Sequence, residues 1–132
     1  VGGQGQTFFE IEENCNGWNI KDDYVLRYEL PNEKIANSFS SYSTFENHLG
    51  TKHSFELNEK SQFNGEKSYQ GFIEKNKKNI SGSIINDSIK KLTFKNDILF
   101  PIEHLLGLIK AAKNGEKIFT KKVFFLIIKI FK

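Results

Sequence analysis

The sequence of 132 residues contains no methionine, a single cysteine and only two prolines. A complete translation product begins with methionine, so we expect this chain to be a piece of a longer protein; removal of a signal peptide from its front is one explanation. Long apolar runs are also missing. The longest, residues 123–130, is interrupted by Lys129 and falls short of the roughly 18 apolar residues that a membrane-spanning helix needs, so we expect no membrane span.

Strong charge of one sign is absent as well. Lysine and arginine total 19 against 16 acidic residues, which gives a net charge of +3. Arg27 is the only arginine among the basic residues. Base-specific recognition relies heavily on bidentate arginine contacts, so this composition argues against a nucleic-acid partner.

The single cysteine, Cys15, supports two interpretations. In a cytosolic protein it would be an inert buried thiol, whereas in an exported protein an unpaired cysteine suggests a partner located elsewhere. Composition alone leaves both possibilities open.

One segment, residues 101–114, has the pattern of an amphipathic helix. Pro101 suits the first turn, and Gly115 offers the left-handed residue that ends a helix. The apolar residues that share one helical face, and that we expect to lie on a sheet, are Ile102, Leu105, Leu106, Ile109 and Ala112. Gly107 is a flaw in this helix, since a mid-helix glycine costs about 1 kcal/mol relative to alanine.

The rest of the chain alternates apolar and polar residues, as half-buried strands do. We expect strands at residues 6–13, 18–30, 34–45, 51–58, 66–75, 80–85, 89–94, 117–119 and 121–131, with a bend or bulge at Asp22 and Asp23. The serine-rich segment 34–45 is either one long strand or an irregular edge. Asn-Gly turns at 16–17 and 64–65 separate some of them. The predicted fold is mainly β: a single domain over residues 1–132 in which a curved antiparallel meander forms a partial, incompletely closed barrel with one helix.

No cluster of residues has the spacing of a catalytic or metal site. His48 and His53 are five residues apart and would point to opposite faces of a strand, so we expect surface or hairpin histidines rather than ligands. Glu103 and His104 lack a nearby nucleophile, and we expect His104 to pack its ring against the sheet. The sequence therefore predicts no catalytic, metal-binding or cofactor-binding residues, and no enzyme.

Three segments taken together resemble a known family. The first is residues 5–11 (GQTFFEI) followed by the Cys-x-Gly-Trp of residues 15–18 and by residues 26–28. The second is residues 43–50 with Phe55, and the third is Phe-Pro-x-x-His at residues 100–104, continuing to residue 124. In this order they are similar to the envelope integrity protein B (EipB-like) family, whose motif falls here on Cys15, Gly17, Trp18, Glu46, Gly50, Phe100, Pro101 and His104.

The resemblance implies a spiral, incompletely closed β-barrel in the periplasm, with a role in cell-envelope integrity and no enzymatic activity. It also implies a disulfide from Cys15 to a cysteine near the C-terminus of the full-length family. This chain has no second cysteine, so either the partner lies in a missing second half or the chain does not form the bridge. The family is about twice this length, so the chain resembles its N-terminal portion. Leu49, Phe125 and Leu126 depart from the family pattern.

The function expected from the resemblance is a non-enzymatic periplasmic protein that binds a partner protein. The alternative is a carrier or chaperone that holds a lipid or lipoprotein chain on the concave face of the barrel; polar side chains on that face would favour a protein partner. A partial barrel also leaves a bare strand edge, and we expect self-association through the edge at residues 123–131.

Overall fold

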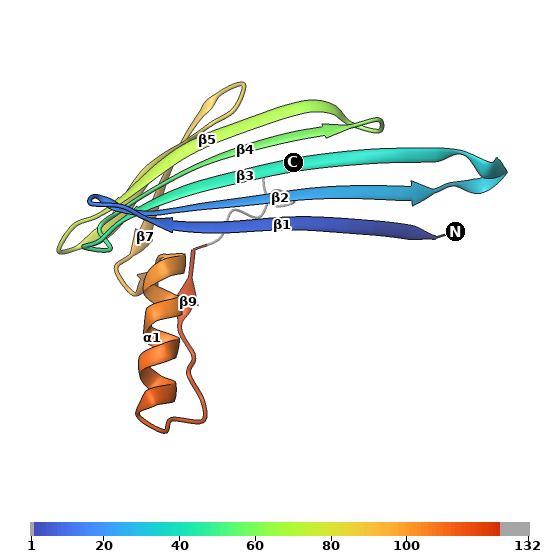
Figure 1. Cartoon of the computed structure of the whole chain (residues 1–132). Coiled ribbons are helices and arrows are strands. Elements are labelled where there is room, and N and C mark those ends of the chain that lie inside the picture. Colours follow the sequence, from blue (N-terminus) through green and yellow to red (C-terminus); the bar gives the residue numbers. More distant parts are fainter. Residues whose placement is uncertain (1, 125–132) are drawn as a thin grey trace.

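The fold is one seven-stranded antiparallel sheet with a single helix attached to one end, seen in a computed structural model that describes residues 2–124 (Figure 1). Each strand pairs with the next one along the chain. The strands are β1 (Gly3–Glu13), β2 (Gly17–Glu29), β3 (Ile35–Asn47), β4 (Lys52–Ser61), β5 (Gly65–Lys75), β6 (Asn79–Ile85) and β7 (Ile89–Lys95). A 3₁₀ turn, η1 (Pro31–Glu33), joins β2 to β3. The sheet is not closed, which confirms the predicted meander and partial barrel.

The helix α1 (Pro101–Lys113) follows the sheet, as expected. The short strands β8 (Ile98–Leu99) and β9 (Lys122–Val123) on either side of α1 form a separate parallel pair. A strand at residues 117–119 was expected and is absent. Of the strand expected at 121–131, only Lys122–Val123 is found, and residues from 125 onward lie outside the described part of the chain.

Asparagine side chains close two of the hairpin turns. The Asn14 side-chain oxygen accepts hydrogen bonds from the backbone N–H groups of Asn16 and Gly17, at 2.8 and 3.1 Å. The Asn76 side chain does the same for Lys78 and Asn79. Such local bonds give the chain a reason to turn at these points.

The pairing of β1 with β2 continues without interruption through Asp22 and Asp23, opposite Phe9 and Phe8. Of the bend or bulge expected at these two residues, the bulge is therefore absent. Asp22 is instead held on the sheet surface by hydrogen bonds from Thr7 and Tyr24.

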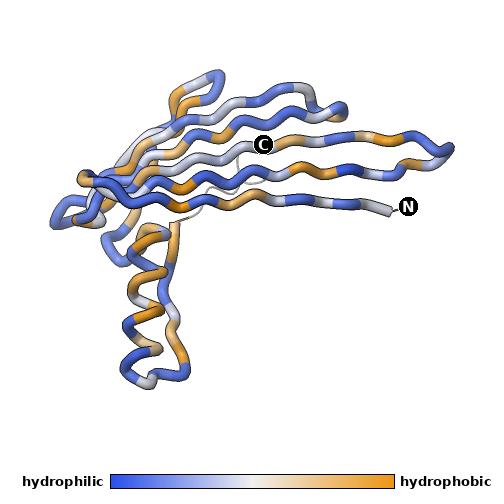
Figure 2. Tube along the Cα trace, in the orientation of Figure 1, coloured by the Kyte–Doolittle hydropathy of each residue, from blue (hydrophilic) through white to orange (hydrophobic). Residues whose placement is uncertain are grey.

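Residues directly opposite one another across antiparallel strands share a face of the sheet. On the concave face, the row nearest the helix runs across all seven strands through Glu13, Trp18, Glu46, His53, Ile73, Gly82 and Leu92. Figure 2 shows the alternation of hydrophobic and hydrophilic residues along the strands. The core on this face is formed by Phe55, Ile73, Ile80, Ile84, Phe100 and Phe124.

The helix does not lie along the sheet, contrary to our expectation. Figure 1 shows it leaving one end of the sheet and running away from the strands. Of the face predicted to be covered, only Ile102 is buried, whereas Leu105, Leu106 and Ile109 are 43–50% exposed and Ala112 is exposed. The sheet covers the first turn alone, because it binds the helix by its N-terminal end.

Gly107 has a packing role that the sequence pattern did not suggest. The chain that returns from the helix brings Phe119 against it, and a Cβ on Gly107 would lie 3.0 Å from the Phe119 ring. The same ring lies 5.7 Å from the ring of His104. His104 therefore packs on this returning segment and not on the sheet, which corrects the expectation for that residue.

The strand β1 was expected to have one buried face, and this was wrong. All of its residues are exposed, including Phe8, Phe9 and Ile11. The apolar face of β1 is present, but within residues 2–124 nothing covers it.

Candidate functional site

The N-terminus of α1 is bound by a buried carboxylate on strand β3. Glu46 is 2% exposed, and its two side-chain oxygens accept hydrogen bonds from the backbone N–H groups of Ile102 and Glu103, at 2.9 and 3.0 Å. These N–H groups have no partner within the helix and carry its positive dipole end, so an acidic acceptor suits them. Burial raises the pKa of the Glu46 carboxyl, and the two backbone hydrogen bonds partly oppose that rise.

A second carboxylate, Glu103, completes the end of the helix. It accepts a hydrogen bond from the backbone N–H of Phe100 at 3.0 Å and forms an ion pair with Lys75 on β5. The Lys75 ammonium also lies 4.4 Å from the centre of the fully buried Phe100 ring. The helix is thereby linked to both β3 and β5.

His53 is buried in the middle of this arrangement, which corrects the expectation of a surface or hairpin histidine. It is 1% exposed, its ring centre lies 5.2 Å from that of Phe100, and its Nδ1 lies 4.0 Å from a Glu46 oxygen. Neither ring nitrogen has a hydrogen-bond partner among the described residues. Burial lowers the pKa of His53 to about 4, so the ring is neutral at neutral pH. His48 is exposed in a turn, as expected, with Nε2 2.8 Å from the Asn14 carbonyl.

Two glycines allow the close approaches that this end of the sheet requires. A Cβ on Gly17 would lie 2.1 Å from the Glu46 carbonyl oxygen, and one on Gly50 would lie 2.8 Å from the Glu103 side chain. Gly50 also has a φ of +67°, in the region that favours glycine. Both positions therefore exclude larger side chains.

We call this end of the sheet the helix anchor, made of Gly17, Glu46, Gly50, His53, Lys75, Phe100 and Glu103. It brings together four of the eight motif residues singled out from the sequence, namely Gly17, Glu46, Gly50 and Phe100. Pro101 occupies the first helical position next to it, and Trp18 lies beside Glu46 in the same cross-strand row. Cys15 is free and exposed in the neighbouring β1–β2 turn, so its pairing with a cysteine outside this chain stays a prediction.

Two anchor residues, His53 and Lys75, were missed as functional candidates. For His53 the sequence held a signal, because it alternates with Phe55 and Leu57, and all three prove to be buried. Nothing in the local pattern around Lys75 indicates its ion pair with Glu103, since the two residues are 28 positions apart.

Away from the anchor, the concave face is open over β1 and β2. We call this surface the open concave patch; it consists of Thr7, Phe9, Asp22, Tyr24, Leu26 and Tyr28. Phe9 is 60% exposed, Tyr24 41% and Leu26 38%. Asp22 accepts hydrogen bonds from the Thr7 hydroxyl at 3.2 Å and the Tyr24 hydroxyl at 2.6 Å, so the patch combines aromatic and polar groups.

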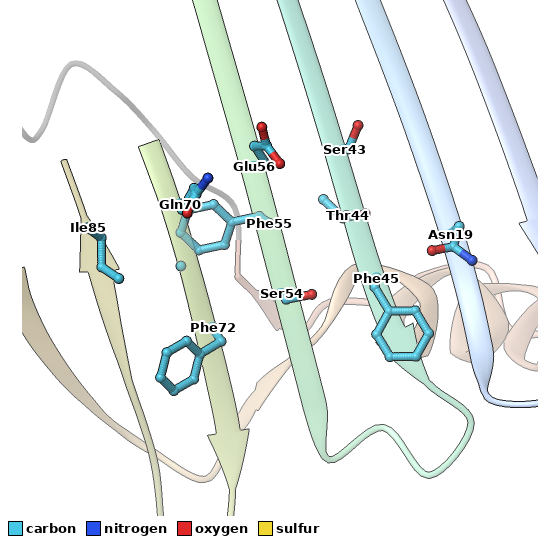
Figure 3. Close-up of a pocket in the computed structure, with 11 residues that line it drawn as sticks. Asn19, Ser43, Thr44, Phe45, Ser54, Phe55, Glu56, Gln70, Phe72 and Ile85 are labelled. Carbon is cyan, nitrogen blue, oxygen red and sulfur yellow. The ribbon is translucent and has the colours of Figure 1, made fainter. Parts of the chain in front are cut away.

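The convex face carries a shallow hollow across the middle strands (Figure 3). Its volume is about 350 Å³, and Phe45 and Phe72 flank Ser54 within it. Glu56 is the only charged residue among those that line it. The hollow offers scattered hydroxyl and amide groups rather than a convergent set of acids and bases.

Residues 2–124 contain neither a cluster of metal-ligating side chains nor a helix that could span a membrane. No group of three or more His, Cys, Asp or Glu side chains in this part of the chain is placed to hold a metal ion. Within the same residues, no helix has both the length and the apolar character needed to cross a bilayer.

Comparison with known proteins places the chain beside one family and one solved fold. A family model described as EipB-like matches residues 1–125. The crystal structure of a beta-barrel-like protein of a domain of unknown function (DUF1849) from Brucella abortus is similar, with a TM-score of 0.85 and 20% sequence identity. The likeness covers 94% of this chain and 52% of that one, so the chain spans about half the length of that structure. Among curated proteins, none matches.

Proposed function

This chain belongs to the EipB-like family, and from that premise we propose that it is a non-enzymatic periplasmic protein that supports cell-envelope integrity by binding a partner protein. The family is associated with periplasmic proteins and carries an envelope-related name. The main support for the proposal is the open concave patch, where Phe9, Tyr24 and Leu26 are exposed. The other half of the same face is a packed core.

The chemistry of the patch favours a protein over a lipid chain. A lipid tail binds best to a continuous apolar lining. Here Asp22 and Thr7 lie among the aromatic residues, and Ser38 and Ser40 of β3 lie opposite Leu26 and Tyr24 on the same face. Exposed tyrosines beside polar groups are typical of protein interfaces, where they supply both apolar area and hydrogen bonds.

The absence of catalysis is part of the proposal and rests on three carboxylates, those of Glu46, Glu103 and Asp22, whose oxygens already have hydrogen-bond partners. Both oxygens of Glu46 accept backbone hydrogen bonds, and Glu103 bonds to Phe100 and Lys75. Both oxygens of Asp22 also accept hydrogen bonds. Each of these carboxylates therefore holds the structure, which leaves it poorly placed to act as a general acid or base.

Site-specific photo-crosslinking in cells that produce the protein tests the proposal. A photo-reactive residue at Leu26 faces the concave side, whereas one at Val25 faces the convex side; the two positions are adjacent and similarly exposed, at 38% and 45%. We expect a discrete protein adduct from position 26 and none from position 25. Equal labelling at both positions would contradict the proposal.

The lipid alternative has its own readout. We expect mass spectrometry of the purified protein to detect no stoichiometric lipid. A co-purified lipid that crosslinks from position 26 would replace partner binding with a carrier function.

A further inference from the structure

The free edge of β1 has the features of a pairing surface. β1 lies at the end of the strand order and pairs only with β2 among the described residues. Its 11 residues are all exposed and form a regular strand without proline, lysine or a bulge. Proline, lysine and bulges are among the devices that natural proteins use to block an exposed edge. The only charges on β1 are the three glutamates of its second half, so the first half of the edge is unprotected.

The outward-facing backbone groups of β1 can be identified from its pairing with β2. Asn14 N–H donates to the Gly17 carbonyl, and Glu29 N–H donates to the Gly2 carbonyl, so the even-numbered positions point toward β2. In an antiparallel ladder this direction alternates from residue to residue. The N–H and C=O groups of Gly5, Thr7, Phe9 and Ile11 therefore point to the free edge.

The charges along β1 are distributed unevenly. Glu10, Glu12 and Glu13 lie in its second half, and the first half is neutral, with Gln4 and Gln6. A parallel copy in register would place glutamates against glutamates, which is destabilising. An antiparallel copy centred on Phe8 places Glu10 opposite Gln6, Glu12 opposite Gln4 and Glu13 opposite Gly3.

We propose that β1 pairs antiparallel with β1 of a second copy of this chain, centred on Phe8, to form a two-fold dimer with a continuous fourteen-stranded sheet. The outward backbone groups of Thr7 in one copy then form hydrogen bonds with those of Phe9 in the other copy, and the same pair occurs a second time by symmetry. Because the two-fold axis is perpendicular to the sheet, both open concave patches face the same side and join. The dimer does not depend on what the patch binds.

Other edges of the structure fit a second copy less well. β7 is shorter than β1, at seven residues, and carries Lys90, Lys91 and Lys95. The sequence predicted self-association through the edge at residues 123–131. Within that range the structure describes Val123, and this residue is already paired with Leu99. We therefore place self-association on β1.

Disulfide trapping tests both the contact and its register. At Phe8 the two copies face each other as a non-hydrogen-bonded pair, for which Cα atoms are about 4.5 Å apart and a disulfide is feasible. In a Cys15→Ser background, Phe8→Cys should form a covalent dimer under mild oxidation. The matched control, Val25→Cys in the same background, lies on the same convex face and is similarly exposed, and it should stay monomeric.

Two further pairs of variants separate pairing from folding. Thr7→Pro removes an outward N–H and should abolish the dimer in sedimentation experiments while leaving the circular dichroism spectrum intact; Thr7→Val keeps the N–H and should dimerise. Gln6→Glu places a glutamate opposite Glu10 of the other copy and should raise the dissociation constant about three- to tenfold, whereas Gln6→Lys should lower it.

The proposal is overturned if Phe8→Cys links no faster than Val25→Cys, or if Gln6→Glu and Gln6→Lys have the same dissociation constant. A chain that sediments as a monomer at all concentrations would also overturn it and would leave the β1 edge to a different polypeptide.

Discussion

The helix anchor and the open concave patch lie on the same face of the same sheet, yet they differ in almost every physical respect. At the anchor, Glu46 and His53 are nearly inaccessible to solvent, and two glycines permit contacts too close for any other residue. At the patch, Phe9 and Tyr24 are largely exposed. Both ends show the same alternation in sequence, so alternation identifies a face and does not say what covers it.

The difference also separates residues of the family motif from the residues that we propose for binding. Gly17, Glu46, Gly50 and Phe100 all belong to the anchor, where they orient the helix. The patch residues, including Tyr24 and Leu26, belong to the surface that we propose for binding. Changes at the anchor should therefore affect stability, and changes at the patch should affect binding.

Among changes at the anchor, Gly17→Ala should lower the free energy of unfolding most. Its Cβ would lie 2.1 Å from the Glu46 carbonyl oxygen, a backbone atom that cannot move without shifting β3. We expect a loss of roughly 3 kcal/mol or more in the free energy of unfolding, measured by urea denaturation. Gly3→Ala is the control, because its nearest neighbour would be 3.5 Å away, and it should change stability by less than about 0.5 kcal/mol. Equal effects would refute the assigned packing.

Removing the Glu46 carboxylate should have the next largest effect. Glu46→Ala leaves two N–H groups at the buried helix end without their acceptors, and we expect a loss of about 2–4 kcal/mol in unfolding free energy. Glu12→Ala, on the exposed strand β1, should be nearly neutral in the same urea titration. A neutral Glu46→Ala would show that the helix is held by other contacts.

His53 should give the anchor a dependence on pH. Its pKa is lowered to about 4 in the folded chain, so the unfolded chain binds more protons between roughly pH 6.5 and 4. The stability associated with neutral His53 is present above pH 6.5 and should fall by about 2–3 kcal/mol as the pH drops toward 4. Glu46 acts in the opposite direction, because a raised carboxyl pKa favours folding at low pH and loses that contribution as the pH rises.

The test is thermal or urea unfolding at several pH values. His53→Leu should remove most of the loss on acidification, whereas the exposed His48→Gln should keep it. If His53→Leu retains the full dependence, the titrating group is another residue.

The smallest effect on stability is expected at the patch. Leu26 is already 38% exposed, so Leu26→Ser should lower unfolding free energy by less than about 1 kcal/mol. The same variant should also abolish the protein adduct formed by a photo-reactive residue placed at Tyr24, which lies on the same face of β2. A Leu26→Ser chain that unfolds as readily as Glu46→Ala would remove the distinction between the two regions.

Much of the fold was predictable from local pattern. The meander, its turns at Asn14 and Gly65, and the helix from Pro101 all follow from alternation, turn chemistry and helix-end signals. The family motif also identified Glu46 and Gly50 before their contacts were known. The meander, the turns and the helix depend on residues close together in sequence, whereas the contacts of Glu46 and Gly50 with the helix end join segments far apart in the chain.

The errors arose where distant segments decide the outcome. The sequence pattern of α1 correctly predicted an apolar face. However, the N–H of Ile102 at the helix end donates a hydrogen bond to Glu46, 56 positions earlier in the chain, and this attachment by the end directs the helix off the sheet. The burial of His53 depends on Phe100 and Phe124, which come from other elements. β1 is exposed because no other element within residues 2–124 covers its apolar face, which its own sequence could not indicate.

The central claim is that Glu46 holds the helix to the sheet independently of the open end. Amide hydrogen exchange of the wild-type chain and Glu46→Ala, compared segment by segment, tests it most directly. We predict that residues 101–113 lose protection in the variant while the amides of β2 and β3 near Leu26 and Ser38 exchange as before. Unchanged protection of the helix, or an equal loss in both regions, would contradict it.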